Sequence, residues 1–327
     1  MRLMVALMLI CAALFLTSLL VGPADLGIGA ALGALWTGEG AAGLVMREIR
    51  APRAVLAVMV GAALGASGAV MQGWLRNPLA EPGLIGVSGA AALGAVIALQ
   101  TGLAAGFALA LPLAALAGAG VAAALLMLLA RPGGGSLALI LAGVAISAFA
   151  GAMTALVLNL SPNPFAAGEI VFWMMGSLAD RSWLHVAIAA PVMAGGAVLI
   201  AGTGRGLDAL TLGEDAAASM GIDLPMLRLR LVIAVAALVG AATAVAGVIG
   251  FVGLVVPHLL RRAVGARPGR LIAASALGGA GLMLAADTAV RVLLPERDLK
   301  LGVVMALIGA PVLLHLIWRQ HRGEDAP

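Results

Sequence analysis

Charged residues are scarce in this sequence, and their scarcity excludes most classes of soluble protein. Of its 327 residues, 10% are charged and 63% are hydrophobic, and the mean hydropathy is +1.13. A soluble domain carries about 25% charged residues, so this chain cannot cover a water-facing surface of ordinary composition. Its apolar runs reach the ~20 residues that a bilayer-spanning helix needs and show no polar alternation. The composition therefore predicts an all-α polytopic membrane protein.

Lysine, cysteine and histidine are also rare, which limits the chemistry of the chain. Lys300 is the one lysine and lies between two leucines, so the phosphate-binding loop GxxxxGK[ST] cannot be assembled. Cys11 is the one cysteine, which excludes an intrachain disulfide and a cysteine-held iron–sulfur cluster. Without the phosphate-binding loop we expect no ATPase activity, and we also expect no bound cofactor. We expect no metal site, because metal-ligand spacing is missing from the four histidines: His185, His258, His315 and His321.

Breaks in hydropathy divide the chain into about ten helices. The first apolar run is long and lacks a small-residue cleavage site, so we interpret it as a retained helix rather than a signal peptide. The eighth helix is short and contains Pro257, so it is expected to be tilted or broken. The predicted helices span residues 3–21, 53–74, 84–101, 105–130, 136–159, 184–202, 229–248, 250–262, 271–293 and 302–319.

An even number of helices puts both termini on one side, and the basic residues indicate which side. With both termini in the cytoplasm, twelve of the 19 basic residues lie in cytoplasmic segments, as the positive-inside rule favours. The other seven face outward: Arg47, Arg50, Arg53, Arg181, Arg291, Arg297 and Lys300. Five of these cluster before the second helix and after the ninth, so topology alone does not explain them.

An internal repeat relates the second predicted helix to the seventh. A single offset of 179 residues aligns three pairs: Gly61 with Gly240, Gly68 with Gly247, and Pro78 with Pro257. Because these helices are an odd number of crossings apart, the repeat is expected to be inverted in the membrane. Inverted repeats are typical of transporters.

Small residues recur every four positions in two helices. Gly61, Gly65 and Ala69 do so in the second helix, and this spacing predicts close packing of helix backbones. A small and weakly polar face in the fifth helix can either pack on a neighbour or border a passage. We predict that it lines the transport pathway through four residues: Gly143, Ser147, Gly151 and Thr154.

Five blocks of sequence, in order, carry a family resemblance. The most specific is Arg50-Ala51-Pro52-Arg53 followed by GAALGASGAVMQGWLRNPLAEPGLIGVSGAAALG from Gly61 to Gly94. The others are FWMMGSL at 172–178, LGEDAAASMGI at 212–222, GFVGLVVPHLLR at 250–261 and LGVVMALIGAP at 301–311. Together they resemble the permease subunits of type II ABC importers for iron–siderophores, haem and cobalamin, the FecCD-type family.

This resemblance implies a single transmembrane permease domain over residues 1–327, with both termini cytoplasmic, in the bacterial inner membrane. It implies a pore formed with a second permease copy and worked by two cytoplasmic ATP-binding-cassette ATPases, which hold the ATP and Mg. A periplasmic substrate-binding protein delivers the cargo, and no nucleic-acid partner is expected. The chain itself is then no enzyme.

The loop at 207–227, between the sixth and seventh predicted helices, matches the family's coupling helices. Polar residues of helix-capping type precede the stretch from Ala216 to Met220. The resemblance implies that the ATPases contact this segment through six residues: Leu212, Gly213, Glu214, Asp215, Ala216 and Ala217. The alternative is an ordinary solvated loop.

The outward arginines also match family positions. The resemblance implies that Arg50, Arg53 and Arg291 meet glutamates of the binding protein, because an arginine fork donates paired hydrogen bonds to a carboxylate. The alternative is pairing inside the chain, since Asp287 and Arg291 are four residues apart on one helix and Glu48 is close to Arg50.

An ion-coupled secondary transporter is the rival function. It needs an acid within the membrane to bind the coupling ion, and Asp287 is the candidate. We interpret His258 as structural or gating, and expect Glu169 and Trp173 to shape the pore entrance. The chain departs from the family pattern near its end, where it carries Asp298-Leu299-Lys300 and Met305, and there docking is less secure.

Overall fold

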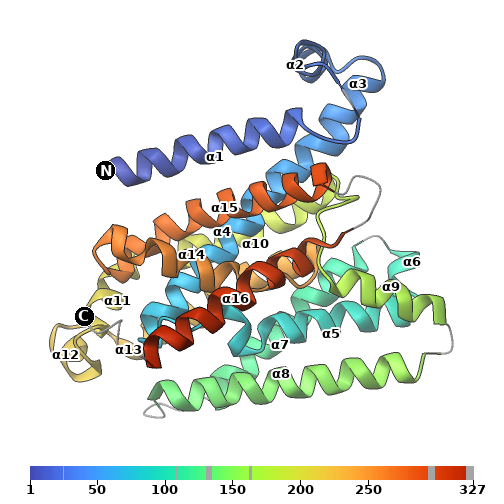
Figure 1. Ribbon diagram of the computed structural model, residues 1–327. Coiled ribbons are helices and arrows are strands. Elements are labelled where there is room, and N and C mark those ends of the chain that lie inside the picture. Colours follow the sequence, from blue (N-terminus) through green and yellow to red (C-terminus); the bar gives the residue numbers. More distant parts are fainter. Residues whose placement is uncertain (25, 108, 130–134, 162–163, 294–298, 322–327) are drawn as a thin grey trace.

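The computed structural model is a bundle of helices, most of which run along one common direction (Figure 1). It describes all residues except 25, 108, 130–134, 162–163, 294–298 and 322–327, and the described part contains no strand. In chain order the elements are α1 (Arg2–Leu20), α2 (Ile28–Thr37), α3 (Gly40–Leu44), η1 (Val45–Arg50), α4 (Ala51–Trp74), η2 (Pro82–Ile85), α5 (Val87–Gln100), α6 (Leu103–Gly106), α7 (Ala110–Leu129), α8 (Gly135–Asn159), α9 (Pro164–Met174), α10 (Trp183–Ile200), α11 (Gly204–Leu210), α12 (Glu214–Ser219), α13 (Leu224–Ala246), α14 (Val252–Arg261), η3 (Arg262–Val264), α15 (Pro268–Leu293) and α16 (Leu301–His321).

All ten predicted helices are present, as α1, α4, α5, α7, α8, α10, α13, α14, α15 and α16. In the described part of the chain, eight helices are long and apolar enough to cross a membrane. The exceptions among the ten are α5, with 14 residues, and α14, with 10. At 1.5 Å per residue they extend about 21 and 15 Å, which is less than the ~30 Å of a bilayer core. The polytopic membrane fold is confirmed.

The packing of the bundle repeats within the chain. Helix α4 packs on α14 and α15, and correspondingly α13 packs on α5 and α7. Helix α5 packs on α7 and α8, just as α14 packs on α15 and α16. Helix α4 starts at the α3 end of the bundle and α13 starts at the α12 end (Figure 1). The chain therefore contains two four-helix units of opposite direction, and the first helix of each unit packs on the second and third helices of the other. This arrangement is consistent with an inverted repeat.

The residue pairs that suggested the repeat do not all keep equivalent places. Gly68 lies inside α4, whereas Gly247 follows the last residue of α13. Pro78 lies in the connection after α4, whereas Pro257 lies inside α14. The single offset fails because α13 ends earlier than the alignment requires, so the repeat holds for helices and not for every residue.

The small residues of α4 bring two backbones together. A Cβ atom on Gly61 would collide with the carbonyl of Gly279 on α15, and one on Gly65 would collide with the carbonyl of Ser275. Gly279 faces the carbonyl of Gly61 in the same way. The four-residue spacing therefore serves helix packing here, as predicted.

The segments that lead into the two short helices, α5 and α14, contact each other. Each follows a non-helical stretch, which ends at Glu81 before η2 and at Phe251 before α14. The Glu81 carboxylate accepts a hydrogen bond from the backbone N–H of Phe251, whose φ of +67° is uncommon for a bulky residue. A Cβ on Gly253 would collide with Pro82. Interrupted segments at corresponding places in two repeats mark the transport region of many carriers.

Replacing Gly65 with Ala should lower the free energy of unfolding by about 1–3 kcal/mol, because the new Cβ meets a backbone carbonyl that cannot move aside. Gly151→Ala in α8 is the matched control, since no atom lies within 4 Å of its added Cβ. Thermal unfolding of the purified chain measures both. Equal unfolding temperatures for the two variants would contradict the packing argument.

Replacing Glu81 with Ala should destabilise the chain by about 1–3 kcal/mol, because the Phe251 N–H loses its buried acceptor. Glu81→Gln retains a side-chain oxygen at the same place and should cost less. Thermal unfolding distinguishes the two variants, and an equal loss in both would show that the hydrogen bond is unimportant.

Candidate functional site

One buried carboxylate joins two arginines at the end of the bundle where α4 begins and α15 ends. The Arg53 guanidinium donates to Asp287 from Nε, at 3.0 and 3.1 Å to the two oxygens, and from Nη2 at 2.9 Å to Oδ1. Arg291 Nε lies 3.2 Å from Oδ2 of the same carboxylate. Two charge-assisted pairs therefore satisfy an acid that is almost fully buried.

Arg50 holds the end of the first helix. Its Nη1 donates to the carbonyls of Leu19 and Leu20 at 3.0 and 2.9 Å, and its Nη2 donates to the carbonyl of Ala24. The last carbonyls of a helix have no partner within the helix. A guanidinium at this position supplies the donors that these carbonyls lack within the helix.

Arg291 supports the same helix end from the other side. Its Nη1 donates to the carbonyls of Ser18 and Val21 at 3.1 and 2.8 Å, and its Nη2 donates to Ser18 Oγ at 2.8 Å. Arg50, Arg53, Asp287 and Arg291, which we call the arginine cluster, thus connect α1, α4 and α15. Helix α1 depends on this anchor, because few of its own residues are buried.

The cluster bears on the predicted docking role of its arginines. Arg50 is 4% exposed and Arg291 8% exposed, and both use their donors within the chain. The Arg53 side chain is the most accessible at 19%. The alternative interpretation, pairing inside the chain, describes Arg53 and Arg291, whereas Arg50 contacts α1 rather than Glu48. Docking stays a prediction, and Arg53 is its best remaining candidate.

The predicted coupling segment forms two short helices, α11 and α12, at the opposite end of the bundle (Figure 1). Helix α12 starts at Glu214, two residues earlier than expected, after Gly213 with φ of +109°. Its first-turn acids Glu214 and Asp215 suit the positive end of the helix dipole. Leu212 is 69% exposed and Met220 is 62% exposed, so two large apolar side chains are accessible at this end of the bundle.

The six predicted coupling residues divide by exposure. Leu212, Glu214 and Asp215 are exposed, and Gly213 and Ala216 are half-buried. Ala217 is fully buried, and its carbonyl accepts a hydrogen bond from the N–H of Ile222. Ala217 therefore anchors the segment on the bundle and cannot itself touch another protein.

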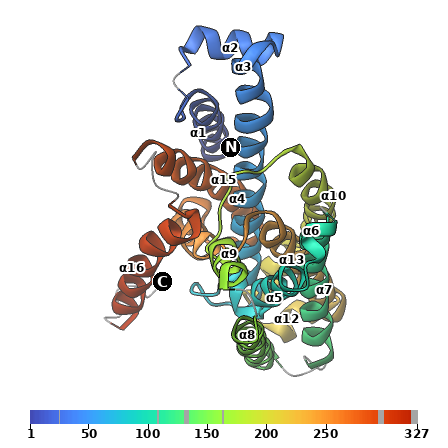
Figure 2. The same cartoon turned by 90° about the vertical axis from the view of Figure 1, so that its right-hand side faces the viewer.

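The predicted pathway residues of α8 face two ways. Gly143 is covered by the Leu84 carbonyl of η2, and Thr154 is buried. Ser147 is half-buried and Gly151 is exposed with no atom near its added Cβ. The four-residue spacing therefore serves packing at Gly143, and only Ser147 and Gly151 remain able to border a passage. Figure 2, which looks along the bundle, shows α8 at its outer edge.

Two of the five resemblance blocks, 172–178 and 301–311, meet the end of α13 at one backbone junction. Gly302 N–H donates to the carbonyl of Gly176 at 3.2 Å, and Ser177 N–H donates to the carbonyl of Ala246 at 2.7 Å. A Cβ on Gly247 or on Gly302 would collide with backbone carbonyls of the neighbouring segments. These glycines let the α9–α10 connection, the α13–α14 connection and the start of α16 touch.

A polar cavity of about 390 Å³ lies beside this junction, and Glu169 and Trp173, which we predicted at the pore entrance, are among its lining residues. Arg181 also lines it, and burial lowers the pKa of the Arg181 guanidinium while the charge of Asp180 raises it. The Lys300 ammonium lies 5.4 Å from the Phe172 ring centre.

Met305 is fully buried, and Asp298 lies outside the described residues. His258 is half-buried in α14, and its gating role stays a prediction.

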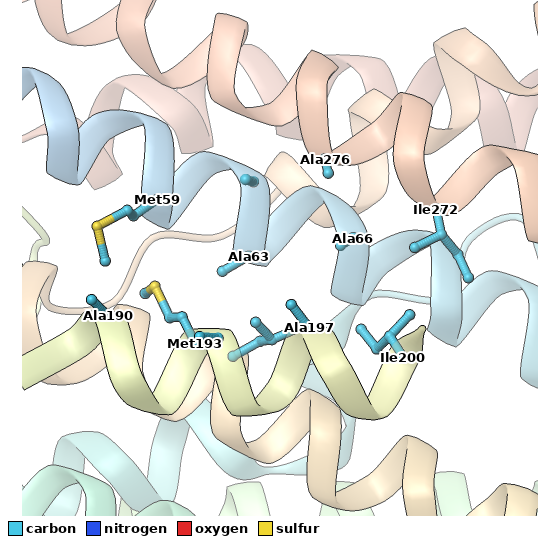
Figure 3. Close-up of a pocket in the computed structure, with 12 residues that line it drawn as sticks. Met59, Ala63, Ala66, Ala190, Met193, Ala197, Ile200, Ile272 and Ala276 are labelled. Atoms are coloured by element: carbon cyan, nitrogen blue, oxygen red, sulfur yellow. The ribbon is translucent and has the colours of Figure 1, made fainter. Parts of the chain in front are cut away.

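A groove of about 410 Å³ between α4, α10 and α15 has a different character (Figure 3). Its labelled side chains come from these three helices and are all alanine, methionine or isoleucine. No lining residue can hold a charged or hydrogen-bonding cargo. Because its lining is wholly apolar, we assign no cargo to this groove.

Sequence reasoning missed Glu81 and the helices α2, α9 and α11. Glu81 was visible as an acid followed by proline in an apolar region between two predicted helices. Helices α2 and α9, with 10 and 11 residues, are too short to give a membrane-spanning hydropathy signal.

Comparison with known proteins gives matches along nearly the whole chain. The model of the FecCD transport family matches residues 9–319. The hemin transport system permease protein HmuU of Yersinia pestis is 39% identical over 331 residues, covering 99% of this chain and 98% of the relative. The vitamin B12 import system permease protein BtuC of Vibrio vulnificus is 38% identical over 278 residues, covering 84% and 82%.

A solved structure shares the fold as well. It is described as an inward-facing conformation of a metal-chelate type ABC transporter, and it superposes with a TM-score of 0.86 at 30% identity. The match covers 97% of this chain and 99% of that one. With the family model and these relatives in agreement, the chain belongs to the FecCD transport family.

Proposed function

We propose that this chain is the permease subunit of an ABC importer in the bacterial inner membrane. It passes a metal chelate of the haem, cobalamin or iron–siderophore class from a periplasmic binding protein to the cytoplasm. The observation that carries this proposal is the family match over residues 9–319, together with relatives named for hemin and vitamin B12 transport. The pore is completed by a second permease copy.

The two ends of the bundle support an orientation. The N-terminus, the C-terminal end of α16 and the α11–α12 segment lie at one end, and the arginine cluster lies at the other, where α3 leads into α4 (Figure 1). The end that carries α11–α12 is rich in arginine, including Arg205, Arg228 and Arg270. By the positive-inside rule this end is cytoplasmic, so ATPases reach α12 and a binding protein reaches the arginine cluster.

Exposed apolar faces supply the contacts that the proposal needs. On either side of α12, Leu212 and Met220 offer an anchor for an ATPase cleft. On α8 and α16, Phe149 and Leu314 are strongly exposed, and both helices lie at the edge of the bundle (Figure 2). These faces suit a second copy of the chain, with the passage between the two copies beside Ser147 and Gly151.

Alternating access then needs a part that moves. We propose that it lies at the two interrupted segments, because α5 and α14 are short helices whose leading stretches are joined by the Glu81–Phe251 hydrogen bond. Motion at α12 reaches this region through α13, whose end leads directly into the stretch before α14. The ATP and Mg that drive the motion belong to the partner ATPases.

An ion-coupled secondary transporter is less well supported. It required Asp287 to be available for a coupling ion, but both Asp287 oxygens are engaged by Arg53 and Arg291. Transport by the chain alone down an ion gradient, with no nucleotide, would favour this alternative.

Leu212→Glu should reduce ATP-driven uptake about tenfold or more, because a charge replaces the apolar anchor at the ATPase contact. Uptake and ATPase association are measured in proteoliposomes with the partner subunits. Leu103→Glu, which changes an exposed leucine at the other end of the bundle, is the control and should leave ATPase association unchanged. Full association of the Leu212 variant would reject the coupling assignment.

Arg53→Gln should weaken binding-protein affinity about tenfold, because one charged hydrogen-bond partner is lost while Asp287 keeps Arg291. Arg47→Gln, at the same end but outside the cluster, is the control. Affinity is measured by titration of the binding protein onto the nanodisc-embedded complex, with thermal unfolding as a check on folding. Wild-type affinity of a folded Arg53 variant would leave the cluster a purely internal support.

A further inference from the structure

A small cationic cavity lies at the α11–α12 end of the bundle, far from the arginine cluster. Its volume is about 160 Å³. The end of α4, the end of α14, the start of α15 and the α11–α12 connection enclose it, through Gln72, Arg76, Thr211, Arg261, Pro268 and Leu271. Two guanidiniums line this space and none of its lining side chains is acidic. The nearby Asp208 carboxylate accepts a hydrogen bond from the Gly269 N–H, beside Pro268.

Gln72 fixes the position of one guanidinium. Its side chain is 1% exposed, and its amide nitrogen faces the carbonyls of Gly253 and Leu254 at 3.5 and 3.3 Å. The amide oxygen is thereby directed to Arg261, whose Nη2 donates to it at 2.8 Å. Arg261 Nε is buried and has no acceptor in the part of the chain that the structure describes. A buried donor without an acceptor is unfavourable.

Arg76 supplies the second guanidinium from another side. It lies just beyond the end of α4, is exposed, and has a φ of +49°, which non-glycine residues seldom adopt. The described residues provide it with no ion-pair partner. Arg76 and Arg261 therefore present free donors from two different segments to the same small space.

The cavity lies where helices leave the membrane. The membrane-spanning helix α4 ends at Trp74, and α15, which also spans, starts at Pro268. Lipid phosphates are found at this level, and basic pockets between transmembrane helices on the cytoplasmic side bind anionic headgroups. A phosphate has more acceptor oxygens than a carboxylate, which suits two guanidiniums that approach from different segments.

We propose that Gln72, Arg76 and Arg261 form a binding site for a phosphate group, supplied by an anionic lipid headgroup or by free inorganic phosphate. Arg76 and Arg261 contact the phosphate oxygens, and Gln72 is a positioning residue that orients Arg261. The bound group joins the end of α4 to the end of α14. This proposal rests on the membrane orientation of the proposed function, but not on the cargo.

The test uses the full chain purified in a maltoside detergent, which contains no phosphate. Dioctanoyl phosphatidylglycerol should raise its unfolding temperature by a few degrees, whereas dioctanoylglycerol, with the same acyl chains and no phosphate, should not. Arg76→Gln and Arg261→Gln should each raise the lipid concentration that gives half of this temperature shift by about tenfold or more. Arg270→Gln removes a charge from the same end outside the cavity and should respond like the wild type.

A parallel titration with inorganic phosphate at constant ionic strength identifies the source. A response to inorganic phosphate supports a site for the free anion, and a response to the lipid alone supports a headgroup site. Absence of any response, wild-type responses of the Arg76 and Arg261 variants, or an equal loss in Arg270→Gln overturns the proposal. So does loss of ATPase association in the Arg76 variant without any phosphate response, which assigns the cavity to a partner carboxylate. If Arg261→Gln fails to fold, the exposed Arg76 carries the test.

Discussion

A polar group inside this bundle must find its partner within the chain, because lipid offers none. The arginine cluster shows the consequence most clearly. Arg50 and Arg291 satisfy carbonyls at the end of α1 that have no partner in their own helix. Asp287 balances the charge, and Arg53 completes the pairing. The same constraint explains why glycines sit where backbones touch, since close packing is the main attraction between helices in lipid.

The constraint also explains where the bundle is interrupted. Helices α5 and α14 occupy corresponding places in the two repeat units, and both are too short to cross a bilayer. The backbone at the start of α14 is satisfied inside the protein, because Glu81 accepts from the Phe251 N–H and the Gln72 amide faces the Gly253 and Leu254 carbonyls. Non-helical backbone at membrane depth is tolerated only when it is enclosed in this way. The non-helical stretches before α5 and α14 have few hydrogen bonds within a helix and lie centrally in the bundle, which suits segments that move during transport.

Hydropathy allowed the ten main helices to be predicted, because each is a long apolar run with polar breaks. Helices α2, α9 and α11 were not predicted, since short helices leave no such signal, whereas α12 was expected from the capping-type residues before Ala216. The burial of Arg50 was also beyond sequence reasoning, because its partners are backbone carbonyls, which no side-chain pattern reveals. The pairing of Asp287 with Arg291 was readable from their four-residue spacing, but the third member, Arg53, is 234 residues away. In α8, the period of small residues was read correctly, yet period alone does not say which of Gly143 and Gly151 is covered.

The anchoring of α1 has a consequence for the order of assembly. Helix α1 is made first, and only 11% of its most apolar window is buried in the finished bundle. Arg291, which reaches back across 273 residues to Ser18, is synthesised near the end of the chain. Arg50 can satisfy the Leu19 and Leu20 carbonyls once α4 has been inserted, whereas the bonds from Arg291 to the Ser18 and Val21 carbonyls form only after α15 has been inserted. Completion of this contact therefore reports that the chain has been made and inserted as far as α15.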